Sequence, residues 1–138
     1  CYFEGTVVTA GRGTQFPFEV YGHPDMKGYP FTFVPESIPG AKNPRYLGEK
    51  CFGTDLRDKP LEAIWEERIN LEYVIDAWKA LGIGDRFFMK NGHFDLLAGV
   101  GWVREMIGSG CHSSEISQRW AGDVKAFEEQ RKTYLLYE

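Results

Sequence analysis

The residues best suited to chemistry lie near the start of the chain, in the stretch EGTVVTAGRGT at positions 4–14. Arg12 stands between Gly11 and Gly13 and is followed by Thr14. The glycines allow positive φ and expose successive backbone N–H groups, while the arginine offers a planar fork that matches a carboxylate. The pattern suits an anionic ligand. Turn glycines are common, however, and the residues alone favour the simpler interpretation that Arg12 is a solvated turn residue.

A carboxylate, Glu4, precedes this arginine by eight residues inside an otherwise apolar and β-branched stretch. In such a strand a carboxylate must point outward, pair with a cation or serve a site, and outward is the commonest outcome. Glycoside hydrolysis generally needs two carboxyl groups that flank the scissile bond, and Glu4 has no evident partner in the sequence. We therefore assign Glu4 no catalytic role.

Other ligand chemistries find little support in the sequence. The glycine pair is followed by Phe16 and a strand-like run, where a dinucleotide-binding fingerprint requires a third glycine and a helix. The histidines and cysteines lack the spacing of a metal site or a redox dithiol; they are His23, His93, His112, Cys1, Cys51 and Cys111. We expect no cofactor and no metal.

Charge and length narrow the class of protein further. The net charge is −4 and the basic residues are scattered, which argues against a nucleic-acid partner. No apolar run is long enough for a transmembrane segment. The 138 residues suffice for one domain, 1–138. Because the chain opens with Cys1-Tyr2-Phe3 and no initiator Met, we expect a domain of a longer protein.

The first half of the chain is rich in aromatic and β-branched residues and is punctuated by Gly and Pro, which predicts short strands joined by tight turns. Strands are expected over 2–8, 16–21 and 31–34, and a further short one over 51–56. Residues 36–49 are expected to form an irregular loop.

The second half has helical periodicity. The spacing predicts one helix over 71–81, capped by Asn70 and ended by Gly82. A second is predicted over 94–107, with Gly99 and Gly101 weakening its middle enough to split it.

A third helix is expected to be long and amphipathic. It starts from Ser113 or Ser114, and its apolar face comprises Ile116, Trp120, Val124, Phe127 and Tyr134. We expect Asp95 to cap the second helix and the tail 131–137 to pack against the core. Strands followed by about three helices predict an α+β domain with mostly antiparallel strands.

Several segments together resemble a known family. They are CYFEGTVVTAGRGTQFPFEVYGHP, FTFVPESIPG, CFGTDLRD, FDLLAGVGWVREMI and the terminal RKTYLLYE. In this order they resemble the C-terminal domain of the NamZ-type exo-β-N-acetylmuramidases, over essentially the whole chain. The resemblance implies a bacterial, usually exported glycoside hydrolase that removes N-acetylmuramic acid from the non-reducing end of peptidoglycan fragments. It also implies a larger, Rossmann-like N-terminal domain that is absent from this chain, with the active site between the two domains.

The resemblance carries specific residues over to a substrate site. The matching positions in the E-G-T and G-R-G-T segments are Glu4, Gly5, Thr6, Gly11, Arg12, Gly13 and Thr14. Position 7 is Val where many relatives have an Asn that could contact ligand. N-acetylmuramic acid carries a lactyl carboxylate that N-acetylglucosamine lacks, so we hypothesise that Arg12 contacts that group. Glu4 would orient Arg12 or hold a sugar hydroxyl.

Three functions remain open at this point. The first is a substrate-binding half of a hydrolase that is inactive alone, because the catalytic carboxylates are expected mainly on the N-terminal domain. The second is a peptidoglycan-binding module that attaches its protein to the cell wall. The third is a structural interaction domain, in which Arg12 pairs with a carboxylate of a neighbouring domain.

Overall fold

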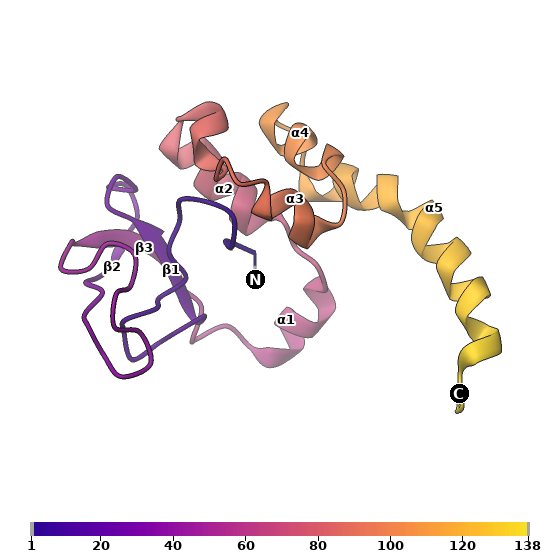
Figure 1. The fold of residues 1–138 in the computed structure, drawn as a ribbon, viewed down its shortest axis with the longest axis horizontal. Coiled ribbons are helices and arrows are strands. Elements are labelled where there is room, and N and C mark those ends of the chain that lie inside the picture. The colour runs from indigo at the N-terminus through magenta and orange to yellow at the C-terminus, as the bar shows by residue number, and fades with distance from the viewer. Residues whose placement is uncertain (1, 138) are drawn as a thin grey trace.

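The computed structural model describes residues 2–137 and confirms an α+β domain. Figure 1 shows a small sheet on one side, a group of helices beside it, and a last helix that runs away from both. The elements are β1 Val20–His23, β2 Phe31–Phe33, β3 Cys51–Asp55, α1 Leu61–Glu67, α2 Glu72–Leu81, η1 Gly84–Phe87, α3 His93–Ala98, α4 Trp102–Gly108, α5 Ser113–Arg131 and η2 Lys132–Tyr134.

The sheet has three antiparallel strands in the order β1-β3-β2. The central strand β3 pairs Gly53 with Gly22 on one side and with Phe31 on the other. The predicted strands over 31–34 and 51–56 are therefore confirmed. The two glycines face each other because the strands approach very closely there: a Cβ on Gly53 would lie 1.8 Å from the carbonyl oxygen of Tyr21.

The strand predicted over 2–8 is wrong, and so is most of the one over 16–21. Residues 2–5 form turns, and the β-pairing of the segment is limited to isolated bridges, Thr6 to Phe88 and Thr9 to Gly22. Gly5 adopts φ 82°, which breaks an extended run. The later strand starts only at Val20, because the residues before it form turns.

The predicted helix ends are largely confirmed. The Asn70 side chain accepts a hydrogen bond from the N–H of Glu72 at 2.9 Å, and Gly82 ends α2 in the left-handed conformation. The second predicted helix is split at Gly99, which has φ 75°, into α3 and α4.

Asp95 does not cap a helix. It lies inside α3, and its carboxylate accepts hydrogen bonds from Nε and Nη2 of Arg104 in α4, each at 2.9 Å. The predicted cap is wrong because the helix begins two residues earlier, at His93. The ion pair joins the two short helices that Gly99 separates.

The sequence pattern predicts no helix over 61–67, where the structure has α1. This helix follows Pro60, and its residues Leu61, Ile64 and Trp65 have helical spacing. None of its residues is buried, and the side chain of Trp65 is 81% exposed. A proline followed by apolar residues at i, i+3 and i+4 is the sequence pattern that could have predicted this helix.

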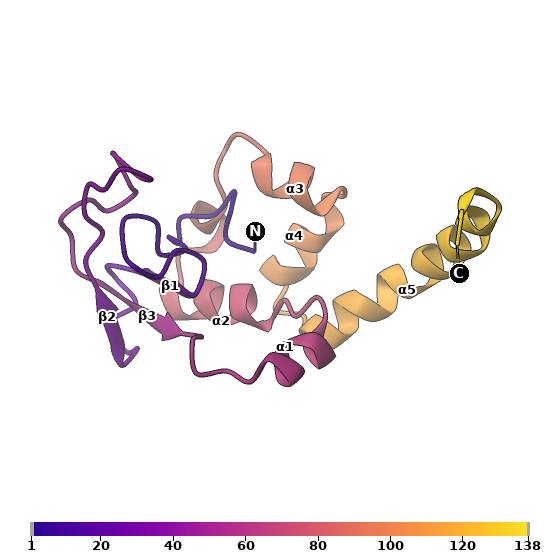
Figure 2. The same ribbon diagram turned by 90° about the horizontal axis from the view of Figure 1, so that it is seen from below.

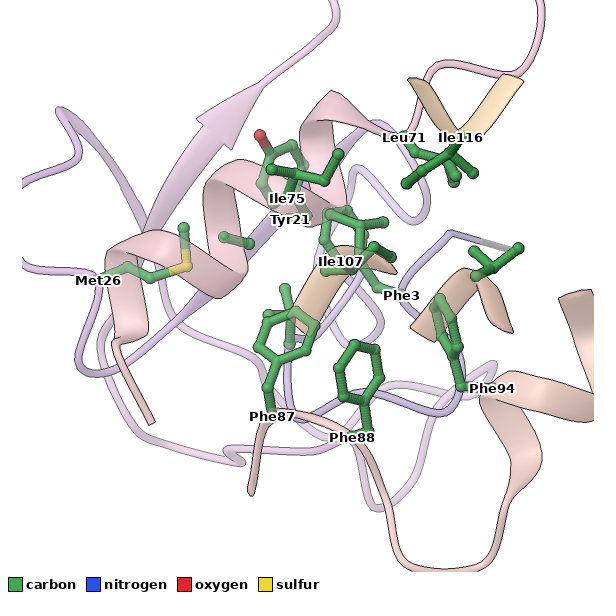
Figure 3. Packing of buried hydrophobic residues seen from close by; sticks show 14 residues of the cluster. Phe3, Tyr21, Met26, Leu71, Ile75, Phe87, Phe88, Phe94, Ile107 and Ile116 are labelled. Carbon is green, nitrogen blue, oxygen red and sulfur yellow. The ribbon is translucent and has the colours of Figure 1, made fainter. Parts of the chain in front are cut away.

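The main hydrophobic core joins the N-terminal segment, strand β1 and the helices. Figure 3 shows the rings of Phe3, Phe87, Phe88 and Phe94 gathered beneath α2. Phe3 also stacks on Tyr21 of β1, with ring centroids 4.4 Å apart. A smaller cluster behind the sheet comprises Val20, Phe33 and Cys51. Burial raises the pKa of the Cys51 thiol to about 12.

The last helix, α5, buries less of its apolar face than its sequence pattern predicts, because its second half is exposed. Among its residues only Ser113 and Ile116 are buried. Residues 131–137 are exposed, so the prediction that the tail packs against the core is wrong. No helix within residues 2–137 is both long and apolar enough to span a membrane. Cys1, one of the residues predicted to form neither a metal site nor a redox dithiol, lies outside the described part of the chain.

The contact between β1 and β3 predicts that alanine substitutions at two glycines have very different effects on stability. Gly53→Ala should lower the free energy of unfolding by about 3 kcal/mol, since its Cβ would collide with the backbone of Tyr21. Gly40→Ala is the matched control, because open space surrounds its Cβ position. Urea denaturation measures both variants. Equal midpoints would contradict the described packing of the sheet.

Candidate functional site

The first predicted segment, E-G-T, is anchored by its glycine and its threonine. A Cβ on Gly5 would lie 2.4 Å from the backbone nitrogen of Phe94, so only glycine permits this contact. The buried Thr6 hydroxyl donates to the carbonyl oxygen of Phe3 at 2.7 Å and accepts from the N–H of Val8. These two residues hold the backbone, and Glu4 before them keeps its side chain at the surface, 38% exposed.

The second predicted segment, G-R-G-T, forms a tight turn. Gly11 and Gly13 have φ 73° and 85°, and a Cβ on Gly13 would collide with the carbonyl oxygen of Glu36. The Thr14 hydroxyl donates to the Gly11 carbonyl oxygen at 2.7 Å. The turn therefore requires its glycines for geometry and holds Arg12 outward, with its side chain 56% exposed.

The structure brings the two segments together through their charged side chains. Nη2 of Arg12 lies 3.9 Å from Oε1 of Glu4, and the guanidinium stands 4.8 Å from the centre of the Phe18 ring. Of the seven predicted residues, Gly5, Thr6, Gly11, Gly13 and Thr14 shape the backbone, while Glu4 and Arg12 present functional groups. Their role in binding substrate stays a prediction.

A pocket of about 440 Å³ opens beside this pair. Its walls come from the N-terminal segment, the turn before β1, the residues after β3, and α1 with the residue that follows it. Tyr2, Phe18 and Tyr73 supply aromatic surface, and Glu4 lies on the wall. Arg12 is not itself one of the lining residues but lies next to two of them, Glu4 and Phe18.

Three of the residues that line the pocket form a hydrogen-bonded cluster of polar groups: Lys59, Glu67 and Tyr73. The Lys59 ammonium donates to Oε1 of Glu67 at 2.5 Å and also to the Tyr73 hydroxyl oxygen. The Tyr73 hydroxyl donates to Oε2 of Glu67 at 2.8 Å. The cluster ties α1, which buries no side chain, to α2.

Each member of this cluster keeps a defined charge. The hydrogen bond from Lys59 lowers the pKa of Glu67, and the same bond raises the pKa of Lys59. Burial raises the pKa of Tyr73. Glu67 is thus a carboxylate, Lys59 a cation and Tyr73 a neutral phenol near pH 7. None of the three is predicted as a site residue from the sequence: Lys59 and Glu67 lie in 57–69, where no element is predicted, and Tyr73 has no local signature within the predicted helix over 71–81.

A second arginine near the pocket is neutralised by its own partner. Arg57 forms a two-pronged pair with Asp55, Nη2 to Oδ2 at 2.6 Å, and its guanidinium stacks 3.8 Å from the centre of the Phe16 ring. Hydrogen bonds from Arg57 lower the pKa of Asp55 to about 2. By contrast, the nearest carboxylate atom to Arg12 is 3.9 Å away, so its donors are more available to a ligand.

Backbone strain also marks this pocket. Three non-glycine residues within 2–137 have positive φ, and two of them, Phe18 at 69° and Arg68 at 50°, line the pocket. Such conformations cost free energy and cluster at ligand sites. The Phe18 ring is presented to the pocket and is 54% exposed. This supports the assignment of the pocket as the candidate site.

The histidines lie apart from this pocket. His23 is half-buried against the Tyr46 ring, and burial lowers its pKa. No group of three His, Cys, Asp or Glu side chains within the described chain could hold a metal ion. The prediction of no metal and no cofactor stays a prediction.

Comparisons with known proteins confirm the resemblance. The model of the family "Exo-beta-N-acetylmuramidase NamZ, C-terminal" matches residues 1–137. The chain is 32% identical over 152 residues to peptidoglycan beta-N-acetylmuramidase NamZ of Bacillus subtilis (strain 168), covering 97% of this chain and 35% of that protein. It is also similar to the 1.30 Å crystal structure of a DUF1343 family protein from Bacteroides fragilis NCTC 9343. That match has a TM-score of 0.95 and 53% identity, and it covers 100% of this chain and 38% of the other. The chain thus spans little more than a third of these relatives.

The charged cluster predicts a pH dependence of stability. Because the folded pKa of Glu67 is lowered, its contribution to stability is present above the ordinary value of 4.5 and is lost as pH falls through the lowered pKa. Glu67→Gln should therefore lower the melting temperature at pH 7, and the difference from wild type should shrink as pH falls below about 4. Calorimetry measures both.

The neighbouring exposed Glu66 provides the control, as Glu66→Gln removes the same charge without touching Lys59. A Glu67→Gln deficit that stays constant from pH 7 to pH 3 would count against the ionised cluster.

Proposed function

The chain belongs to the C-terminal domain family of exo-β-N-acetylmuramidase NamZ, and from that premise we propose that it forms one wall of a saccharide site. The substrate class is a peptidoglycan-derived saccharide with N-acetylmuramic acid at its non-reducing end. In this proposal the chain binds and orients the terminal sugar and does not by itself cleave the glycosidic bond.

The observation that carries the proposal is the position of Arg12. Its guanidinium lies beside Glu4 and Phe18, two residues of an aromatic-lined pocket, and its nearest carboxylate atom is 3.9 Å away. The lactyl carboxylate of N-acetylmuramic acid is an anion that N-acetylglucosamine lacks. A paired, charge-assisted hydrogen bond from Arg12 to that group would favour the muramic sugar, with backbone N–H groups of the turn assisting.

The remaining wall residues serve the sugar ring and its hydroxyl groups. The rings of Tyr2 and Phe18 offer flat apolar surface to the face of a pyranose. Glu4 either orients Arg12 or accepts a hydrogen bond from a sugar hydroxyl. The Lys59–Glu67–Tyr73 cluster fixes the wall formed by α1.

Bond cleavage requires a carboxyl group that is protonated near neutral pH. Within the described residues, the pKa of Asp55 and that of Glu67 are lowered, which suits ion pairing and not proton donation. We therefore place the catalytic carboxyl groups in a Rossmann-like N-terminal domain of the longer protein. Since its substrate lies in the cell wall, we propose that the protein is exported.

Substitution of Arg12 tests this function in the full-length enzyme. Arg12→Ala should lower kcat/KM on a muramic acid glycoside by about 10- to 100-fold, the loss expected for a charge-assisted hydrogen bond. It should change kcat/KM on the matching glucosamine glycoside by less than about threefold, since that sugar offers no carboxylate. Steady-state kinetics on both glycosides measure the ratio.

Arg86→Ala is the matched control, because Arg86 is an exposed arginine that does not line the pocket. An equal loss on both sugars would mean that Arg12 supports the fold or the domain interface. No loss on either would favour a purely structural domain.

A further inference from the structure

The apolar stripe of α5 is covered along only half its length. Ile116, Trp120, Val124 and Phe127 follow one another at helical spacing and share one face of the helix. Ile116 is buried and Trp120 packs against the core, whereas Val124 is 49% and Phe127 59% exposed. We call these last two residues the docking stripe.

The exposure of the docking stripe follows from the course of the helix. In both Figure 1 and Figure 2, α5 leaves the body of the domain and its C-terminal half stands apart from α1–α4. The chain then continues with four more exposed large hydrophobic residues, Tyr134, Leu135, Leu136 and Tyr137. Contiguous exposed apolar surface of this kind marks an interaction site.

We propose that the docking stripe binds an apolar groove on the N-terminal part of the same polypeptide, so that α5 acts as a strap between the two parts. The family that matches this chain is a C-terminal one, and the chain spans 35% and 38% of two relatives. About two thirds of such a protein therefore lies outside this chain and provides the occupant. This inference does not depend on the proposed saccharide specificity.

The charges around the docking stripe do not favour a membrane surface as its partner. The flanking residues of α5 carry both signs, with Asp123, Lys125 and Arg131 among them, and supply no basic face for an anionic membrane. Self-association through this stripe alone is also weak. Two exposed residues three positions apart cover about one turn, whereas a coiled coil needs three to four heptads.

The experiment measures hydrogen–deuterium exchange of α5 in the full-length protein. In the wild type, amides of 121–131 should exchange slowly, because the helix is docked. Val124→Glu combined with Phe127→Glu should accelerate their exchange by roughly tenfold or more, since the buried apolar contact is lost. Glutamate favours helix at least as well as Val or Phe, so the change does not itself melt α5.

Lys125→Glu is the matched control: it lies on the opposite side of the helix and changes the net charge by the same amount as the double substitution. Its exchange should equal that of wild type, and amides of α2 should be unchanged in every variant, which shows that the core stays folded. The proposal is overturned if wild-type 121–131 exchanges as fast as the tail 135–137, or if the double substitution has no effect. It is also overturned if protection rises with protein concentration together with a dimer mass in light scattering.

Discussion

The close approach of Gly5 to the backbone of Phe94 is the constraint on which the rest of the domain depends. It lets the N-terminal segment run between the sheet and the helices, so that Phe3 enters the core against Tyr21 and the N–H of Val7 reaches the carbonyl oxygen of Phe87 at 2.9 Å. The hydroxyl of Tyr46 binds the Val7 carbonyl oxygen from the opposite side. These hydrogen bonds on both sides hold the backbone of the segment, and so place Glu4 on the wall of the pocket.

The ion pairs around the candidate site decide which of its cations can still bind an anionic ligand. Arg57 and Lys59 are held by carboxylates at 2.6 and 2.5 Å, which fixes the walls and leaves those cations little capacity for a further anion. Arg12 is more exposed and its carboxylate neighbour is more distant. Two cations of the pocket wall are therefore paired, while Arg68 on the wall and Arg12 beside it are exposed. Such a site is better suited to recognising a single anionic substituent than to general electrostatic attraction.

Much of the fold could be predicted from the sequence, and the failures have physical causes. The helix over 71–81 has its cap and its glycine stop in the sequence, and the break at Gly99 follows from glycine's conformational freedom. The strand predicted over 2–8 failed because β-branched residues favour an extended backbone, while a tertiary contact at Gly5 decides the local path. α1 carries no buried residue, so periodicity gave a weak signal. At the site, sequence singled out Glu4 and Arg12, whereas the Lys59–Glu67–Tyr73 cluster depends on three segments meeting in space and has no local signature.

We propose that this domain selects a muramic sugar through one arginine, Arg12, beside an aromatic pocket. A crystal structure of the full-length protein with N-acetylmuramic acid bound tests it most directly. The account predicts the lactyl carboxylate within hydrogen-bonding distance of the Arg12 guanidinium, with the pyranose ring beside Tyr2 or Phe18. A sugar bound with its carboxylate on residues of the N-terminal domain, and with Arg12 out of contact, would contradict it.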